Sequence, residues 1–261
     1  MSVELDGAGV VITGGGGGIG AALARKLAGQ GSRLVLADLD GDAVRAVAEE
    51  VGGTAVVGDA ASEEGVRRLV AEARAALGEV DLFCANAGVA VHGGPETTED
   101  GWALSWEVNV MAHVRAAREL LPGWLERGRG HFLATVSAAG LLTSLGSAPY
   151  SVTKHGALAF AEWLSVTYRH RGITVQAICP QGVRTKMLAD TGKEGEFIMG
   201  ASAIEPEDVA DTCLEGLRDG RFLILPHPEI ADYYAARATQ NERWLGGMNK
   251  LQRKVEQAVQ P

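Results

Sequence analysis

Two residues in the middle of the chain are spaced to move a proton together. Tyr150 and Lys154 are four residues apart in the stretch Ser147-Ala148-Pro149-Tyr150-Ser151-Val152-Thr153-Lys154. On a helix, this spacing puts both side chains on one face. A phenol has a pKa of about 10, and a fixed cation nearby lowers it, so the pair is suited to acid and base catalysis. The same spacing also arises by chance in helices where the tyrosine packs and the lysine is solvated.

A glycine-rich stretch near the start of the chain is suited to binding a phosphate group. The β-branched residues 10–13 predict a buried strand, residues 14–20 read Gly-Gly-Gly-Gly-Gly-Ile-Gly, and a helical pattern begins at Ala21. Strand, glycine turn and helix are the context of a dinucleotide-binding turn, in which the helix N-terminus meets the pyrophosphate. This stretch fits the pattern G-x-G-x-x-G/A in two registers, Gly15/Gly17/Gly20 and Gly16/Gly18/Ala21. The alternative is a flexible glycine loop.

Acidic residues follow the next two predicted strands. Asp38 lies twenty residues after Gly18, where a dinucleotide fold places an acid on the adenosine ribose. Two like charges about 4 Å apart repel by about 4 kcal/mol at a protein surface, and neither Gly17 nor Leu39 supplies a cation, so NAD is favoured over NADP. Asp38 also fits a helix cap, although Asp40 can fill that role. Asp59 fits an adenine contact and a helix cap equally well.

The composition excludes some classes of partner. The net charge is −9 with a pI near 5.2 and no basic run, which argues against nucleic acid and anionic membranes. The first residues lack a signal-peptide pattern, and no apolar run approaches the roughly 18 residues of a membrane span. We therefore expect a cytoplasmic protein with a small-molecule partner. The three cysteines are expected to be buried thiols, and no spacing indicates a metal site.

Strand-like and helical segments alternate along the chain. This alternation predicts an α/β fold of the Rossmann type, a doubly wound parallel sheet of about seven strands with helices on both faces. No linker or repeat divides it, so residues 1–261 are expected to form one domain. The strands are expected at about 9–13, 33–37, 54–58, 80–84, 131–136, 173–179 and 222–225.

Six motifs in order resemble the short-chain dehydrogenase/reductase family over residues 5–225. Thr13-Gly14-x-x-x-Gly18-Ile19-Gly20 is similar to its glycine motif, and Asn86-Ala87-Gly88 to its N-A-G motif. Tyr150-x-x-x-Lys154 matches its Y-x-x-x-K. The other matches are Asn109, Ser137 and the P-G-x-x-x-T-like stretch Pro180-Gln181-Gly182-Val183-Arg184-Thr185, in which Gln181 separates a proline and glycine that are usually adjacent.

The resemblance implies an NAD-dependent enzyme that interconverts a secondary alcohol and a ketone. Tyr150 would be the general acid and base, and Lys154 would lower its pKa and bind the nicotinamide ribose. Ser137 would orient the substrate oxygen, and Asn109, in a helix expected at about 101–127, would hold a proton-relay water. For Asn109 the alternative is a buried amide that bonds backbone. The implied cofactor-binding residues are Gly14, Gly17, Gly18, Ile19, Gly20, Asp38, Leu39, Asp59, Ala60, Asn86, Ala87, Gly88, Tyr150, Lys154, Pro180, Gly182, Val183 and Thr185.

Two later segments are expected to shape the substrate site. Residues 185–203, here called the lid, mix apolar side chains with glycines, which suits either a substrate lid or a surface helix and favours a neutral or lipophilic alcohol. Residues 229–258 are expected to form a helical extension interrupted at Gly246-Gly247. Its apolar stripe of Trp244, Met248, Leu251 and Val255 needs a surface to cover, and we expect it to pack either on a neighbouring subunit or over the substrate mouth.

Other functions share this pattern. A catalytically silent dinucleotide-binding scaffold would be expected to have lost one of the four catalytic side chains, and none is missing. Epimerases and dehydratases on this fold usually have longer chains. The family's helices at about 101–127 and after Tyr150 commonly pair across a two-fold axis, which implies a homodimer or homotetramer.

Overall fold

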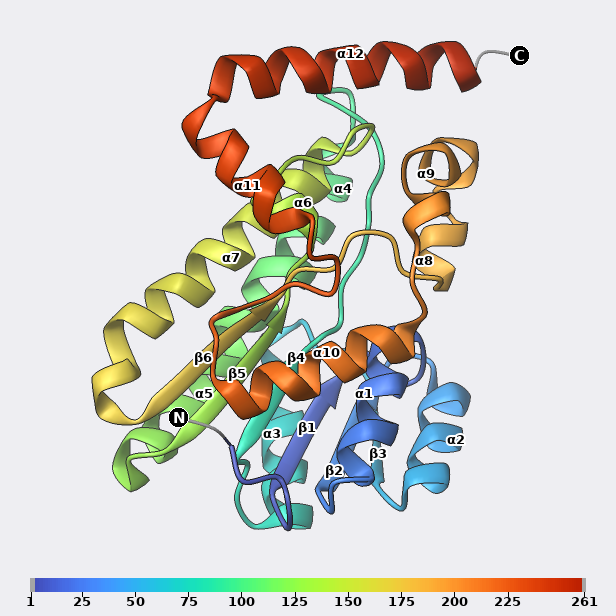
Figure 1. The fold of residues 1–261 in the computed structure, drawn as a ribbon. Coiled ribbons are helices and arrows are strands. Elements are labelled where there is room, and N and C mark those ends of the chain that lie inside the picture. The colour runs from blue at the N-terminus through green and yellow to red at the C-terminus, as the bar shows by residue number, and fades with distance from the viewer. Residues whose placement is uncertain (1–2, 260–261) are drawn as a thin grey trace.

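The computed structural model of the chain describes residues 3–259. Its centre is one parallel sheet of seven strands in the order β3-β2-β1-β4-β5-β6-β7 (Figure 1). The strands are β1 Gly9–Thr13, β2 Arg33–Asp38, β3 Thr54–Val57, β4 Leu82–Ala85, β5 Gly130–Thr135, β6 Ile173–Ile178 and β7 Leu223–Ile224. Every expected strand is present, with ends within two residues of those expected, and the α/β fold class is confirmed.

Helices cover both faces of the sheet because strand side chains alternate between the two faces. Val11, Phe83 and Phe132 pack with helices α3 Glu63–Leu77, α5 Ala112–Arg127 and α7 Ala148–Tyr168. Val10, Ile12 and Leu133 pack with α1 Gly18–Ala28, α2 Gly41–Val51 and α10 Pro206–Asp219. Each fully buried aliphatic side chain contributes about 1.5–3 kcal/mol, so two large apolar layers hold the sheet in place.

The chain reverses direction across the sheet between β3 and β4. After β3 at one edge, it returns to place β4 beside β1, with Val10 opposite Leu82. In open α/β sheets, ligands bind outside the carboxyl ends of the strands at this reversal. The residues that follow β1, β4 and β5 are therefore candidates for a ligand-binding site.

The remaining helices lie at or beyond this carboxyl edge. They are α4 Glu99–Trp106, a π turn Glu107–Met111, α6 Ala138–Leu141, α8 Lys186–Ala189, α9 Gly192–Met199, a short 3-10 turn Gly200–Ser202, α11 Ile230–Thr239 and α12 Asn241–Val259. A second 3-10 turn, Arg169–Arg171, precedes β6 at the opposite, amino edge. Within residues 3–259, no helix is both long enough and apolar enough to span a membrane.

The C-terminal extension is helical as expected, but its break was predicted at the wrong place. The chain bends at Gln240, and α12 continues through Gly246 and Gly247. Helix α12 runs past α9, as Figure 1 shows, and Val255 is buried. The apolar stripe therefore has a partner in this chain. The stripe offsets the roughly 1 kcal/mol that each glycine costs in a helix.

Candidate active site

Tyr150 and Lys154 lie near the start of α7, which has a proline in its first turn. Lys154 is buried, and its Nζ donates a hydrogen bond to the Thr135 carbonyl, 3.0 Å away at the end of β5. The same Nζ lies 5.6 Å from the centroid of the Tyr150 ring. The two side chains share one helix face, as the spacing predicts.

Ser137 brings a hydroxyl to the same place because it lies two residues after the end of β5. It is the N-cap of the short helix α6, where its Oγ accepts the Ala139 N–H at 3.1 Å. Its hydroxyl donates to the Pro180 carbonyl at 3.4 Å, and its side chain lies close enough to Tyr150 to act on the pKa of the phenol. The serine and the tyrosine therefore present two adjacent hydroxyls at the carboxyl edge of the sheet.

Burial dominates the ionisation of this cluster. It raises the pKa of Tyr150 above its ordinary value, against the opposing effect of the Ser137 side chain. It lowers the pKa of Lys154 to about 8. The net direction for Tyr150 is thus opposite to the predicted one. The reason is geometric, because the ammonium bonds a backbone carbonyl and faces the ring, while desolvation favours the neutral phenol.

Asn109 lies in the π turn between α4 and α5, within the expected helical stretch but in a conformation that the pattern did not predict. Its side chain accepts the Val89 N–H at 3.0 Å and donates to the Val89 carbonyl at 2.9 Å and to Thr153 Oγ1 at 3.1 Å. These are the backbone bonds of the alternative interpretation, a buried amide that clamps a loop to α7. A Cβ at Gly88 would lie 3.2 Å from Asn109 Oδ1 and 3.3 Å from Lys154 Nζ, so both groups converge there.

The glycine turn after β1 has the conformation that its motif requires. Gly14 and Gly18 have positive φ, and a Cβ at Gly20 would overlap the Gly14 carbonyl oxygen. Thr13 holds the neighbouring loop, because its Oγ1 accepts the N–H groups of Asn86 and Ala87, each at 3.0 Å. These contacts support the register Gly14, Gly18 and Gly20.

The N-terminus of α1 differs from those of the neighbouring helices. Asp40, Ser62 and Thr98 cap α2, α3 and α4 with their side chains, and all three helices have acidic residues in the first turn. Helix α1 has neither a side-chain cap nor an acid there. Uncapped N–H groups and the helix dipole attract an anion, so this end fits the pyrophosphate of a dinucleotide.

Asp38 lies at the end of β2 beside this turn. Its Oδ2 accepts the Gly16 N–H at 2.9 Å, and its Oδ1 accepts the Asp40 N–H at 3.1 Å. Asp40 caps α2 through Ala43, so the helix does not need Asp38 as its cap. Leu39 is 75% exposed next to it. The position suits a ribose contact with an apolar neighbour.

Asp59 makes the contacts of a local turn ahead of α3. It accepts the N–H groups of Ala61 at 2.8 Å and Ser62 at 3.2 Å, while Ser62 itself is the cap. Burial alone would raise the pKa of Asp59, but these hydrogen bonds outweigh it and hold the pKa below its usual value. The contacts that Asp59 makes within the protein are therefore those of a residue in a helix-capping turn. Ala60 is its neighbour in the chain.

Residues 180–185, here called the nicotinamide loop, follow β6 and lead into the lid. The Pro180 carbonyl accepts the Ala138 N–H at 2.8 Å, which joins the loop to the residue after Ser137. The Thr185 methyl lies close to Gly18 of the glycine turn. Gly182 packs against Met199, and Val183 pairs with Ile204 beyond the lid. The loop thus borders the catalytic residues, the phosphate turn and the lid.

Sequence reasoning missed two residues that hold the site together. Thr135 binds Lys154 through its carbonyl and donates its hydroxyl to Asn86 Oδ1 at 3.1 Å. Its position at the end of a predicted strand is the sequence signal that could have identified Thr135. His227 contacts the nicotinamide loop from the segment after β7. No motif marks it, because its partners are backbone groups far away in the sequence.

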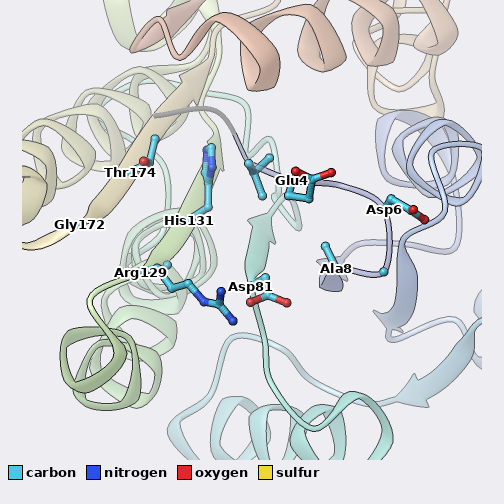
Figure 2. Close-up of a pocket in the computed structure, with 11 residues that line it drawn as sticks. Glu4, Asp6, Ala8, Asp81, Arg129, His131, Gly172 and Thr174 are labelled. Atoms are coloured by element: carbon cyan, nitrogen blue, oxygen red, sulfur yellow. The ribbon is translucent and has the colours of Figure 1, made fainter.

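Two pockets lie outside the cluster. One, of about 900 Å³, is bounded by the loops at 92–96 and 143–147, by the outer face of α7, by Glu194 of α9 and by Gln252 of α12, so the lid and the extension share a cavity. His92 lies on its wall. Figure 2 shows the other, at the amino edge of the sheet. There Asp81 already binds the Gly9 N–H, and His131 binds Gln176.

Comparisons with known proteins identify the family of this chain. Residues 8–196 match the short chain dehydrogenase family model. The 1-deoxy-11-beta-hydroxypentalenate dehydrogenase of Streptomyces exfoliatus is 37% identical over 229 residues, which cover 84% of this chain and 82% of that protein. The 2,5-dichloro-2,5-cyclohexadiene-1,4-diol dehydrogenase of Sphingobium indicum is 33% identical over 190 residues, which cover 71% of this chain and 76% of that protein.

A solved structure is similar over most of the chain. A short chain dehydrogenase/reductase from Burkholderia phymatum in complex with NAD superposes with a TM-score of 0.85 at 29% identity, covering 92% of this chain and 96% of that one. The family and this complex support a nicotinamide dinucleotide as cofactor. The chain therefore belongs to the short-chain dehydrogenase family of oxidoreductases.

Proposed function

We propose that this protein is an NAD-dependent oxidoreductase that interconverts a secondary alcohol and a ketone. The observation that carries the proposal is the convergence of three side chains: Ser137 acts on the pKa of Tyr150, and the buried Lys154 ammonium lies 5.6 Å from the centroid of the Tyr150 ring. Two neighbouring hydroxyls can bind one substrate oxygen, one orienting it and the other exchanging its proton. The bound cofactor supplies the hydride acceptor or donor.

Each residue of the chain has a defined task in this proposal. In oxidation, the Tyr150 oxygen takes the alcohol proton while Ser137 holds the same oxygen. In reduction, Tyr150 returns the proton to the ketone oxygen. Among residues 3–259, Thr135 accepts one of the three N–H groups of Lys154, and the others would be donors for the nicotinamide ribose. Asn109 fixes the loop at Val89, and it would also hold a relay water near Lys154.

NAD is favoured over NADP by the charge at the adenosine end. Asp38 would face the ribose, and Leu39 offers no cation to neutralise a 2′-phosphate. The glycine turn and residues 86–88 would contact the remainder of the dinucleotide, and Val183 and Thr185 the nicotinamide.

The substrate is proposed to be a neutral or lipophilic alcohol. The lid contributes Met187 and Phe197, both partly exposed, and few cations. The names of the two relatives describe hydroxylated compounds. A homodimer or homotetramer is proposed because Leu104, Trp106, Val152, Trp163 and Val166 leave an apolar face exposed on α4 and α7.

Replacing Tyr150 by phenylalanine tests this function. Y150F should lower kcat for any alcohol that reduces NAD by roughly 10²–10⁴, the usual contribution of a general acid or base. NADH affinity, measured by fluorescence, should stay close to that of the wild type. The matched control is Y233F, at an exposed tyrosine of α11. Equal turnover by Y150F and the wild type would refute the assignment.

A further inference from the structure

A buried histidine joins the two ends of the lid. His227 follows β7 and is 3% exposed. Its Nδ1 accepts the N–H of Gln181 at 3.1 Å, and its Nε2 lies 3.2 Å from the carbonyl of Ser202. Gln181 belongs to the nicotinamide loop and Ser202 to the last turn of the lid. One side chain thus contacts both the loop before the lid and the last turn of the lid.

Both partners fix the protonation of this ring. The Gln181 N–H can only donate, so Nδ1 carries no proton. The Ser202 carbonyl can only accept, so Nε2 carries one. His227 therefore acts as a neutral imidazole with one acceptor and one donor, each used for a backbone group. Few other side chains offer an acceptor and a donor on opposite sides of one rigid ring.

The backbone next to His227 closes the base of the lid. The N–H of Ile204 donates to the Gly182 carbonyl at 3.1 Å, and the N–H of Arg184 donates to the Ile204 carbonyl at 2.9 Å. A Cβ at Gly182 would meet Met199 at 2.9 Å, so the two sides of the lid base are in close contact. His227 adds a third connection at the end nearest to β6.

Gln181 takes the place of the glycine in the family motif. In P-G-x-x-x-T the glycine follows the proline directly and the threonine comes four residues later; here Gln181 follows Pro180 directly and Thr185 comes four residues after Gln181. The loop therefore keeps the length of the motif. A buried N–H without a partner costs about 1–3 kcal/mol, and His227 supplies the acceptor for the N–H of Gln181.

We propose that His227 is a positioning residue that fixes the nicotinamide loop to the lid, through its bonds to Gln181 before the lid and to Ser202 in the lid's last turn. The loop cannot shift without breaking the bond at Gln181, and the lid base cannot open without breaking the bond at Ser202. Cofactor binding and lid position are therefore coupled through one side chain. The proposal rests on the proposed function, because it assigns the loop a cofactor to hold.

Three variants separate the two bonds of His227. H227L removes both. H227N keeps an acceptor near the Nδ1 position for Gln181 but does not reach Ser202. H227Q offers an acceptor and a donor. The matched control is H131L, which removes another buried histidine whose side-chain bond to Gln176 lies at the opposite edge of the sheet.

The measurements are NADH affinity by fluorescence and amide hydrogen exchange, both well below each unfolding temperature. H227L should weaken NADH binding about tenfold, as expected for one lost buried hydrogen bond, and should speed exchange at Gln181 and Ile204 by about the same factor. H227N should speed exchange near Ile204 while Gln181 stays protected, and H227Q should recover most of the affinity. H131L should change NADH affinity by less than about twofold, because the His131–Gln176 bond is distant from the nicotinamide loop and its loss should lower stability alone.

Two results would overturn the proposal. One is equal loss of NADH affinity in H227L and H131L. The other is faster exchange spread evenly over the domain in the His227 variants, without a maximum at 181–204. If H227L does not fold, H227N decides the question through its local exchange pattern. None of these measurements uses an alcohol, so a failure to find alcohol oxidation would affect the proposed function and leave this test intact.

Discussion

Replacement of His113 by phenylalanine should make the protein less sensitive to acid. His113 lies on α5, one turn after Asn109, and is 2% exposed. Its ring packs edge-on against Phe132 with 6.0 Å between centroids, and neither ring nitrogen has a hydrogen-bond partner among residues 3–259. Burial, with a smaller effect of the Lys154 charge, lowers the pKa of His113 to about 3.

The size and sign of the effect follow from this shift. In the unfolded chain the imidazole titrates near its ordinary pKa of about 6.5, so below that pH the unfolded state binds a proton that the folded state refuses. The stability linked to His113 is therefore complete above pH 6.5 and is lost progressively as the pH falls toward 3. One pKa unit corresponds to about 1.4 kcal/mol, so the whole loss is about 5 kcal/mol, of which about 3 kcal/mol is gone by about pH 4.5.

Urea unfolding of the wild type and H113F at pH 8, 6 and 4.5 measures this difference. Between pH 8 and 4.5, the free energy of unfolding of the wild type should fall by about 3 kcal/mol more than that of H113F. The control L120A, at a buried leucine of the same helix, should be less stable than the wild type by the same amount at each pH. Parallel pH curves for H113F and the wild type would show that this imidazole does not resist protonation in the fold.

Three further perturbations test the cofactor turn and the tyrosine. G20A should destabilise the fold by about 1–3 kcal/mol in urea unfolding, because its Cβ would overlap the Gly14 carbonyl, whereas G17A, with open space around it, should cost less. D38N should reduce the preference for NAD over NADP by roughly 10–100-fold in kcat/KM, because a repulsion of up to about 4 kcal/mol is removed; an unchanged ratio would place the ribose elsewhere. In an absorbance titration without cofactor, the difference between the wild type and Y150F reports the ionisation of Tyr150. It should appear only above the ordinary tyrosine pKa of about 10. A phenolate near neutral pH would show that burial does not control the pKa of Tyr150.

The sequence predicted the sheet well because parallel strands buried on both faces carry strong local signals. Runs such as Val10-Val11-Ile12 are apolar and β-branched, and glycine or aspartate marks their ends. The predicted strand ends also located Ser137 and Asp38, since Asp38 is the last residue of β2 and Ser137 lies two residues after β5. The spacing of Tyr150 and Lys154 placed them on one face, because α7 is regular from its first turn.

Features that depend on distant contacts were not predictable in the same way. The π turn at Asn109 has no local signature, and the asparagine bonds Val89 and Thr153, twenty and forty-four residues away. Glycine propensity predicted a break at Gly246-Gly247, but packing of α12 near α9 overrides propensity and moves the break to Gln240. His227 escaped notice for the same reason, since its partners are backbone groups 46 and 25 residues away.

The pKa of Tyr150 shows why residue types and spacing alone do not determine a site's chemistry. Spacing brings a cation near a phenol, which favours the phenolate, but burial acts on both groups and favours their neutral forms. With the pKa of Lys154 lowered to about 8 and that of Tyr150 raised, the protein alone holds a phenol beside an ammonium at neutral pH. That is the protonation state a general acid needs for ketone reduction. Alcohol oxidation needs the phenolate, so its stabilisation must come from charge or hydrogen bonds that arrive with the bound reactants.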